Sequence, residues 1–321
     1  MKHLLSIEKL PKADMEKILA ASALMKKSRG KKHPPQPLAG KIWAMLFTKS
    51  STRTRVSFEV GIRELGGQPI FLNATEIQLG RGEPIKDTAR VLGRMVHGAV
   101  FRTFAQSDVE EFAAYSKLPT INALTDDEHP CQILADIFTF QEKRGSIKGK
   151  IVTFVGDGAS NMANSWIFAA AKLGFELRIA APRNFWPAKE IIARAGGKLG
   201  PVAPAGQKSV YYYEFPSGGK IALTEDLKSA AMESDLLYTD VWISMGKEAE
   251  SADRIEQMKG YQINRLLVKL ANPDALVMHC LPAYRGKEID DETFEANAQT
   301  IFDEAENRLH AQKAVLEWIV S

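Results

Sequence analysis

The sequence contains very little cysteine, which restricts the kinds of protein it can be. Cys131 and Cys280 are the only two cysteines in 321 residues. This number excludes a disulfide-rich scaffold and an all-cysteine zinc site, and it suits a reducing compartment. The apolar run within residues 1–7 is too short for a signal peptide. We therefore expect a cytoplasmic protein.

Long apolar runs and an excess of one charge are also lacking. No segment approaches the ~20 apolar residues that a membrane-spanning helix needs. Lys and Arg total 42 and Asp and Glu total 39, so the formal net charge is only +3. A protein that coats nucleic acid or binds an anionic membrane usually has a stronger charge imbalance. We expect neither nucleic acid nor a membrane as a partner.

Internal repeats, low-complexity tracts and Pro/Ser-rich linkers are absent, so the domains must be inferred from the order of predicted elements. At ~150 residues per domain, the length suggests two domains. Short apolar strands alternate with amphipathic helices in both halves, which predicts parallel sheets covered by helices. The predicted strands are 42–47, 69–73, 99–104 and 120–124 in the first half, and 151–155, 176–180, 220–223, 236–241 and 275–280 in the second.

The fold class we expect is therefore α/β, with two doubly wound parallel-sheet domains. The glycines and polar residues at 145–149 mark the boundary between them. We predict a first domain at 1–145, a second at 146–302 and a long C-terminal helix within 303–321. The pattern of that helix is compatible with packing on either domain, and we expect it to return to the first.

Polar and titratable residues follow five of the predicted strands. These residues lie at 50–55, 102, 126–132, 240–246 and 279–286. Open parallel sheets bind their ligands outside the carboxyl ends of the strands. Because the five segments come from both halves of the chain, they predict a site in a cleft between two domains.

The segment Ser51–Arg55, which reads Ser-Thr-Arg-Thr-Arg, is the strongest local indication of a ligand. Hydroxyl and amide groups at the positive end of a helix dipole bind anions. Arg53 and Arg55 add donors that match phosphate oxygens. No glycine-rich Walker loop is present, so a nucleoside triphosphate is not the expected anion. Taken alone, the segment fits a Ser/Thr helix cap with a solvated basic face equally well.

Three further residues are candidates for the same anion site. Arg102 ends a predicted strand and can supply a second cation, although alone it reads as a surface arginine. His129 precedes Pro130 at a helix start, where a neutral imidazole can donate a hydrogen bond to a carbonyl or simply cap the helix. Gln132 can bind a substrate amide through both its donor and its acceptor.

Two patterns in the second half are weaker. Gly156–Asn161 resembles the start of a dinucleotide-binding turn but lacks the third glycine, so we do not expect NAD. Cys280 and His279 are adjacent and do not have the spacing of zinc ligands. Cys280 is either a buried small side chain or a thiol in a cleft near Asp240. We expect neither a metal nor a cofactor.

Four segments, in this order, resemble motifs of the carbamoyltransferase family. Ser51–Arg55 looks like the family's carbamoyl phosphate loop, and His129–Asp136 matches its H-P-x-Q-x-L-x-D segment. Both are shared by the aspartate and ornithine branches. Asp240–Gly246 is similar to the D-x-x-x-S-M-G loop, and His279–Pro282 to the H-C-L-P loop, of the ornithine branch. The resemblance extends over essentially the whole chain.

This resemblance implies transfer of the carbamoyl group of carbamoyl phosphate to the δ-amine of L-ornithine, giving citrulline and phosphate. The residues it assigns to carbamoyl phosphate are Ser51, Thr52, Arg53, Thr54, Arg102, His129, Gln132, Cys280, Leu281 and Arg308. Those it assigns to ornithine are Asn161, Asp240, Ser244 and Met245. It gives the catalytic roles to Arg53, Arg102, His129 and Cys280.

Two departures from the family pattern keep other acceptors open. Ser160 stands where the family often has a second Asn, and Tyr284 where many members have His. Putrescine, an N-acylornithine and aspartate are therefore alternatives, although the intact Ser244–Gly246 segment disfavours putrescine. A nucleotide-binding dehydrogenase and a non-enzymatic regulator are the alternatives from other classes. The resemblance also implies a homotrimer or a multiple of trimers, with the loop Gln78–Glu83 completing a neighbour's site.

Overall fold

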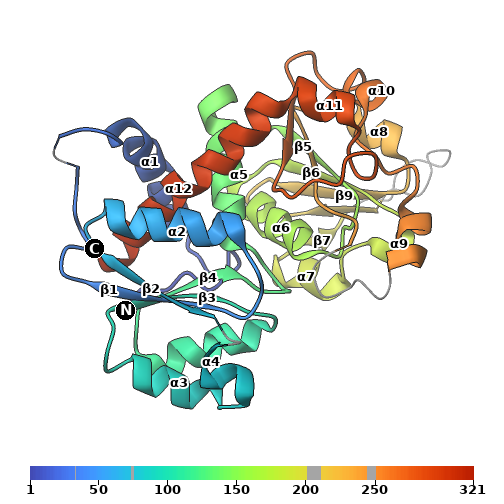
Figure 1. The fold of residues 1–321 in the computed structure, drawn as a ribbon. Helices are drawn as coiled ribbons and strands as arrows, with labels where there is room; N and C mark the ends of the chain where they lie inside the picture. Colours follow the sequence, from blue (N-terminus) through green and yellow to red (C-terminus); the bar gives the residue numbers. More distant parts are fainter. Residues whose placement is uncertain (33, 74–75, 201–210, 244–250) are drawn as a thin grey trace. The chain divides into compact units, whose positions relative to one another are not determined.

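The computed structural model describes residues 1–32, 34–73, 76–200, 211–243 and 251–321 (Figure 1). The chain divides into two compact units. Unit 1 consists of Met1–Phe138 and Glu306–Ser321, and unit 2 consists of Thr139–Ala305. Each unit has its own sheet, so each can be understood from its own core.

Unit 1 contains a four-stranded parallel sheet in the order β2-β1-β3-β4. Its strands are β1 (Ile42–Phe47), β2 (Gln68–Asn73), β3 (Gly98–Arg102) and β4 (Thr120–Leu124), and its helices include α1 (Lys12–Ser28), α2 (Thr52–Glu64), α3 (Ile85–Leu92) and α4 (Gln106–Ser116). Parallel neighbours need a crossover connection, and α2, α3 and α4 supply these. Helices α3 and α4 lie on one face of the sheet and α2 on the other (Figure 1).

The N-terminal segment extends this sheet beyond β4. The amide of Leu4 donates to the carbonyl of Thr120 at 3.0 Å, and the amide of Asn122 donates to the carbonyl of Leu4 at 2.7 Å. Leu4 and Ile7 are fully buried. The edge of β4 is therefore covered by a segment that the sequence analysis did not identify as structured.

Unit 2 contains a seven-stranded sheet in the order β11-β10-β5-β6-β9-β8-β7. Its strands are β5 (Ile151–Val155), β6 (Glu176–Ala180), β7 (Lys198–Leu199), β8 (Tyr211–Glu214), β9 (Lys220–Thr224), β10 (Leu236–Thr239) and β11 (Leu276–His279), and its helices are α6 (Asn161–Leu173), α7 (Lys189–Arg194), α8 (Leu227–Ala231), α9 (Ser251–Met258), α10 (Arg265–Val268) and α11 (Asp291–Ala296). Helices α6 and α7 cover one face, and α8, α10 and α11 the other (Figure 1).

The two outer strands of this sheet differ from the prediction. Both β7 and β8 were missed, and β8 pairs antiparallel with β9 and with β7. Only Phe215–Gly219 connects β8 to β9, and a connection this short permits a hairpin but no parallel crossover. The other strands of unit 2 pair in parallel, so the α/β class with two sheets is confirmed.

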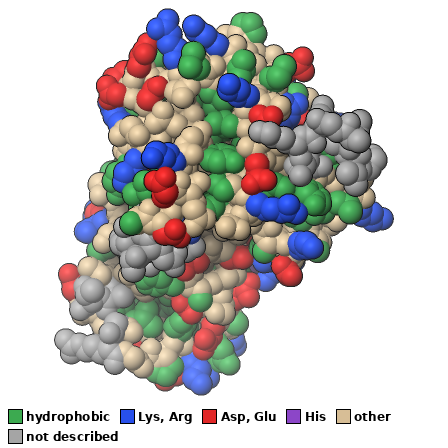
Figure 2. All heavy atoms as spheres, turned by 90° about the vertical axis from the view of Figure 1, so that its right-hand side faces the viewer, with side chains coloured by type: hydrophobic (Ala, Val, Ile, Leu, Met, Phe, Trp, Pro, Cys, Tyr) green, Lys and Arg blue, Asp and Glu red, His purple; other side chains and the backbone are tan. Residues whose placement is uncertain are grey.

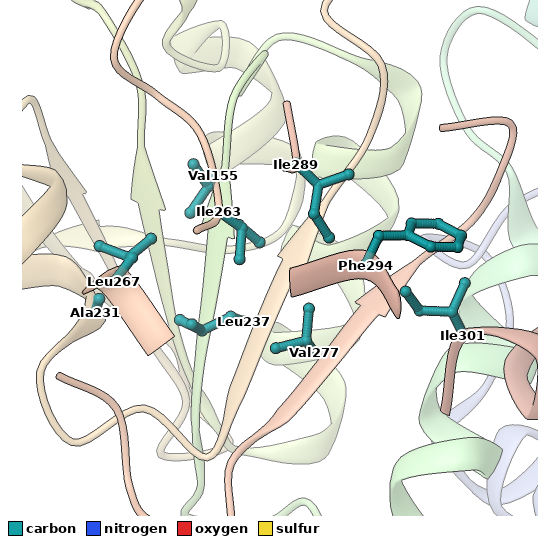
Figure 3. Close-up of a cluster of buried hydrophobic side chains, with 9 residues drawn as sticks. All are labelled: Val155, Ala231, Leu237, Ile263, Leu267, Val277, Ile289, Phe294 and Ile301. Carbon is teal, nitrogen blue, oxygen red and sulfur yellow. The ribbon is translucent and has the colours of Figure 1, made fainter. Parts of the chain in front are cut away.

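The apolar core of unit 2 joins the sheet to the helices on one face. Figure 3 shows buried side chains from β5, β10 and β11 meeting side chains from α8, α10 and α11. The members of this cluster are Val155, Ala231, Leu237, Ile263, Leu267, Val277, Ile289, Phe294 and Ile301. The near-continuous apolar strands predicted from the sequence are therefore the ones that carry the core.

Two helices continue across the division of the chain. Helix α5 (Pro130–Arg144) and helix α12 (Ala298–Val320) each have residues in both units. The C-terminal part of α12 packs on α2: Lys313 Nζ contacts Glu64 Oε2 at 2.7 Å, which confirms that the final helix returns to the first sheet. The helix begins at Ala298 rather than at 303, because Ile301 is already buried in the core of unit 2.

The surface carries side chains of both positive and negative charge. Figure 2 shows Lys and Arg side chains interspersed with Asp and Glu on the face in view. Among the described residues, no helix combines the length and the apolar character that a membrane crossing requires.

We expect Gly98→Ala to destabilise unit 1. Gly98 lies opposite Trp43 in the β1–β3 register, and a Cβ at this position would come within 2.6 Å of the Trp43 ring. Overpacking a buried site of this kind costs about 1–3 kcal/mol in the free energy of unfolding, measurable by urea denaturation. Gly200→Ala is the control, because its nearest heavy atom is 3.6 Å from the new Cβ. Equal effects of the two substitutions would contradict the prediction.

Candidate active site

The first turn of α2 has the features of an anion site. Ser51 precedes the helix in an extended conformation, and the first turn contains no acidic residue. An Asp or Glu there would be favoured by the helix dipole, so an acid-free turn leaves the amides and the positive dipole end for an external anion. The hydroxyl of Ser57 donates to the carbonyl of Arg53 at 2.7 Å.

The second arginine of the Ser-Thr-Arg-Thr-Arg segment, Arg55, contacts protein groups outside the first turn of α2. The guanidinium carbon of Arg55 lies 3.6 Å from the centroid of the Phe71 ring. The Nε of Arg55 lies 3.8 Å from Glu59 Oε2. Residues two positions apart on a helix do not share a face. Arg53 is therefore the arginine of this segment that remains a candidate.

Arg102 and Arg308 join Arg53 in a cluster of like charge. Arg102 ends β3 and is 4% exposed, and Arg308 on α12 donates from Nη2 to Thr54 Oγ1 at 2.6 Å. Burial, and then the charges of Arg308 and Arg53, lower the pKa of Arg102 to about 9. Among the described residues, Arg102 Nε has no hydrogen-bond partner. Arg102 and Arg308 are buried and Arg53 is partly buried, and cations that repel one another in this way favour binding of an anion between them.

His129 adds a neutral hydrogen-bonding group to this cluster. Its side chain is 5% exposed, at the start of α5. Burial, followed by the charges of Arg308 and Arg102, holds the pKa of His129 well below its ordinary value. The imidazole is therefore neutral at physiological pH, and one of its nitrogens can donate a hydrogen bond to a carbonyl oxygen.

Gln132 is held by the carboxylate of Asp136, a member of the His129–Asp136 motif to which the resemblance assigns no role. Gln132 Nε2 donates to Asp136 Oδ1 at 2.8 Å, and Asp136 is fully buried. The two residues are four apart on α5, so their side chains lie on one face. That spacing was visible in the sequence, but only the buried contact shows that Asp136 orients the amide.

Glu128 was also missed, although it immediately precedes His129. It is fully buried, and its Oε2 accepts from the amide of Ile7 at 2.8 Å. Burial raises the pKa of Glu128 to about 8, an effect that the amides of Ile7 and Glu8 oppose. No local pattern announces this residue, because its partners are about 120 positions away in the chain.

Asp240 and Cys280, two of the predicted site residues, form a hydrogen-bonded pair in unit 2. They follow β10 and β11, which are parallel neighbours with Thr239 opposite His279. Cys280 Sγ donates to Asp240 Oδ1 at 3.0 Å, and the amide of Val241 donates to the same oxygen at 2.7 Å. Burial raises the pKa of Asp240, and the nearby His279, followed by these two hydrogen bonds, partly offsets that effect. The parallel pairing thus brings together residues 40 positions apart.

The backbone around Cys280 is shaped by His279. This side chain is fully buried, its Nδ1 accepts from the amide of Leu281 at 2.9 Å, and its Nε2 lies 3.2 Å from Glu288 Oε1. The proton must therefore be on Nε2 if both contacts are hydrogen bonds. The amide of His279 donates to Glu304 Oε2 at 2.9 Å. Leu281 has a φ of 59°, a left-handed conformation that these contacts maintain.

Asn161 is the first residue of α6, at the carboxyl end of β5. Ser160 caps this helix, because its side chain accepts from the amide of Ala163 at 3.2 Å. Ser160 therefore has a structural task at the position where the family often has Asn. Tyr284 is 52% exposed. Ser244 and Met245 lie outside the described residues.

The turn before α6 is held by packing and by an ion pair. Gly158 is required by packing, since a Cβ there would come within 2.6 Å of Ile179 and 2.7 Å of the Phe185 carbonyl. Asp157 forms a buried ion pair with Arg254. Within the described residues, no three His, Cys, Asp or Glu side chains gather to hold a metal ion.

The predicted site residues thus fall into two groups, one in each unit. Unit 1 holds Ser51, Thr52, Arg53, Thr54, Arg102, His129, Gln132 and Arg308, and unit 2 holds Asn161, Asp240, Cys280 and Leu281. Residues Gln78–Arg81 form a short 3-10 turn in unit 1, followed by Gly82 at a φ of 94°.

Comparisons with known proteins agree along the whole chain. A family model described as "Aspartate/ornithine carbamoyltransferase, carbamoyl-P binding domain" matches residues 2–142, and one described as "Aspartate/ornithine carbamoyltransferase, Asp/Orn binding domain" matches residues 148–319. Ornithine carbamoyltransferase from Akkermansia muciniphila is 50% identical over 98% of this chain and 97% of its own. The Acinetobacter baumannii protein of the same name is 45% identical over 100% of this chain and 97% of its own.

Solved structures show the same similarity. The anabolic ornithine carbamoyltransferase from Campylobacter jejuni matches with a TM-score of 0.88 and 40% identity, over 99% of each chain. The enzyme from Pyrococcus furiosus matches with a TM-score of 0.87 and 42% identity, over 98% of this chain and 96% of its own.

We expect Glu128→Gln to change how stability depends on pH. Folding raises the pKa of Glu128 from 4.5 to about 8, so the native state favours the protonated form. Wild-type protein therefore loses stability as the pH rises from 5 to 8, by up to about 1.4 kcal/mol per pH unit for this one proton. The Gln side chain has no such proton, so the free energy of unfolding of the variant should rise relative to that of wild type between pH 5 and pH 8.

Urea denaturation at pH 5, 6, 7 and 8 measures this difference. Glu16→Gln is the control, because Glu16 is exposed on α1. Wild type and Glu128→Gln with parallel pH curves would show that the buried carboxyl does not titrate as expected.

Proposed function

Because the chain belongs to the aspartate/ornithine carbamoyltransferase family, we propose that it transfers the carbamoyl group of carbamoyl phosphate to the δ-amine of L-ornithine. The products are citrulline and phosphate. One observation carries the proposal: Arg53, Arg102 and Arg308 cluster beside the first turn of α2 and next to a neutral His129. Such a cluster suits a small dianion with a carbonyl group next to it.

Unit 1 binds carbamoyl phosphate in this proposal. The first-turn amides and hydroxyls of Ser51, Thr52 and Thr54 bind the phosphate together with the Arg53 and Arg308 guanidinium groups. Arg102 and His129 donate to the carbonyl oxygen, and Gln132 binds the carbamoyl amide. The partnerless Nε of Arg102, counted over the described residues, supports this arrangement, because buried donors are nearly always paired when the ligand is bound.

The chemistry follows from these contacts. The neutral δ-amine attacks the carbonyl carbon, a tetrahedral intermediate forms, the amine loses a proton, and the C–O bond to phosphate breaks. Donors placed where the oxyanion develops contribute about 10²–10³ each in rate. The phosphate is already a good leaving group, so orientation within a cationic site accounts for most of the acceleration. No covalent enzyme intermediate is needed.

Unit 2 binds the acceptor. The Asp240 carboxylate accepts from the α-ammonium group of ornithine, and Asn161 binds at the same amino-acid end. Ser244 and Met245 complete this set. The hydrogen bonds from Cys280 Sγ and the Val241 amide favour the ionised form of Asp240 that an ammonium group requires. Cys280 and Leu281 belong to the carbamoyl phosphate contacts in the proposal, with Cys280 in a catalytic role.

The proposal extends to organisation and setting. Residues 1–145 form the carbamoyl phosphate domain, 146–302 the ornithine domain, and 303–321 the returning helix. The protein works in the cytoplasm as a homotrimer, with Gln78–Glu83 of one subunit completing the site of its neighbour. It acts toward citrulline and thus toward arginine biosynthesis, as the anabolic relative from Campylobacter jejuni is named.

We expect citrulline when the purified protein receives carbamoyl phosphate and L-ornithine. A colorimetric ureido assay with ornithine, putrescine, N-acetylornithine and aspartate in parallel makes the test specific, because each acceptor gives a distinct product. Ornithine should give the highest kcat/KM. Turnover with one of the other three alone would replace ornithine as the acceptor.

We expect Arg53→Ala and Asp240→Ala to separate the two substrates. Loss of the Arg53 guanidinium removes a charge-assisted contact to phosphate, so carbamoyl phosphate binding should weaken by about 10²-fold. Loss of the Asp240 carboxylate should raise mainly the KM for ornithine. Arg55→Ala is the matched control, since Arg55 is held at Phe71 and Glu59. If Arg53→Ala bound carbamoyl phosphate as Arg55→Ala does, the assigned phosphate site would be wrong.

A further inference from the structure

Arg254 is a buried arginine of unit 2 to which neither the family motifs nor the proposed mechanism gives a role. It lies on α9, and its side chain is 10% exposed. Its Nη2 pairs with Asp157 Oδ2, and its Nε donates to the carbonyl of Trp242 at 3.2 Å. The guanidinium carbon also lies 4.7 Å from the Phe185 ring centroid. One side chain thus joins two loop segments and a helix.

The first of these segments leads to Asn161. Asp157 is 3% exposed and follows β5 after a single glycine. Its Oδ1 accepts from the amide of Ala159 at 3.0 Å, and its carbonyl accepts from the amide of Ser160 at 3.2 Å. These bonds shape the turn that ends in Asn161. A displacement of the Asp157 carboxylate would therefore displace Asn161 as well.

The second segment contains Asp240. Trp242 stands two residues after it, and the strands before the two segments are parallel neighbours with Val155 opposite Thr239. The turn after β5 lies against this segment: a Cβ on Gly156 would be 3.7 Å from Trp242 Cδ1 and 3.9 Å from the Asp240 carbonyl. Arg254 therefore bonds to both segments next to the two acceptor residues.

We propose that Arg254 is a positioning residue for the acceptor, which fixes Asn161 and Asp240 relative to each other through Asp157 and the Trp242 carbonyl. This inference rests on the proposed function, because it needs these two residues to bind the amino-acid end of the acceptor. Buried ion pairs contribute little to stability compared with apolar packing of equal volume. The planar guanidinium can bind a carboxylate and a carbonyl at once, which a single ammonium group does less well.

The test compares Arg254→Lys, Arg254→Gln and Asp157→Asn with wild type. Kinetics should give kcat and the KM for each substrate, and thermal unfolding should give Tm. Arg178→Lys is the matched control, since Arg178 also bonds a carboxylate and two carbonyls in unit 2, at Glu176, Ala230 and Met232. It should lower Tm without changing either KM by more than about twofold.

The KM for the acceptor should rise in the order wild type, Lys, Gln, by about tenfold or more in Arg254→Gln, because small displacements of binding groups have large effects. The KM for carbamoyl phosphate should stay within about twofold of wild type. Asp157→Asn should raise the acceptor KM as well. In the double variant Arg254→Gln/Asp157→Asn, the acceptor KM should be no higher than in Arg254→Gln alone, because both substitutions break the same ion pair.

A lowered Tm with an unchanged acceptor KM in Arg254→Lys and Asp157→Asn would overturn the inference and leave Arg254 a purely structural residue. Additive effects in the double variant would also overturn it. If Arg254→Gln does not fold, the Lys and Asn variants still decide, because they conserve side-chain volume. The proposed function is tested separately, by whether the wild-type protein makes citrulline from ornithine. The acceptor KM of each variant is compared with that of wild type for whichever acceptor the wild type uses.

Discussion

The clustering of three arginines, two of them buried, is the constraint on which unit 1 depends. Arg53, Arg102 and Arg308 come from three different elements. Burial, and then the charges of Arg308 and Arg53, lower the pKa of Arg102 to about 9. Such a cluster favours the binding of an anion, because a dianion placed among the guanidinium groups offsets their repulsion. Burial, and then the charges of Arg308 and Arg102, hold the pKa of His129 well below its ordinary value, so the group proposed to donate to the carbonyl is neutral because of its place in this cluster.

Unit 2 has the opposite electrostatic arrangement. Its central group is the Asp240 carboxylate, whose pKa is raised by burial, an effect that His279, the thiol of Cys280 and the amide of Val241 partly offset. A carboxylate of this kind gains from the approach of an ammonium group. In the proposed reaction the anionic substrate binds at the arginine cluster of unit 1 and the amino substrate at the Asp240 carboxylate of unit 2, and the near-neutral composition of the chain conceals this difference.

Much of the fold was predictable because strands buried on both faces have a simple pattern. The ranges 42–47, 120–124, 151–155 and 176–180 coincide with β1, β4, β5 and β6. The pattern failed where the environment is different. The strand Tyr211–Glu214 lies near the sheet edge, is not fully buried and pairs antiparallel, and the start of α12 depends on burial of Ile301 in a core assembled from distant segments.

The sequence by itself determined the α/β class, the order of the motifs and which residue types could bind phosphate and an amino acid, because these depend on local periodicity and on the chemistry of single side chains. Only the tertiary structure decided that Arg55 contacts Phe71 while Arg53 stays with the cluster, that Glu128 accepts from the amide of Ile7, and that Arg254 pairs with Asp157. Burial and charge proximity arise between segments far apart in the chain, and no local pattern contains that information.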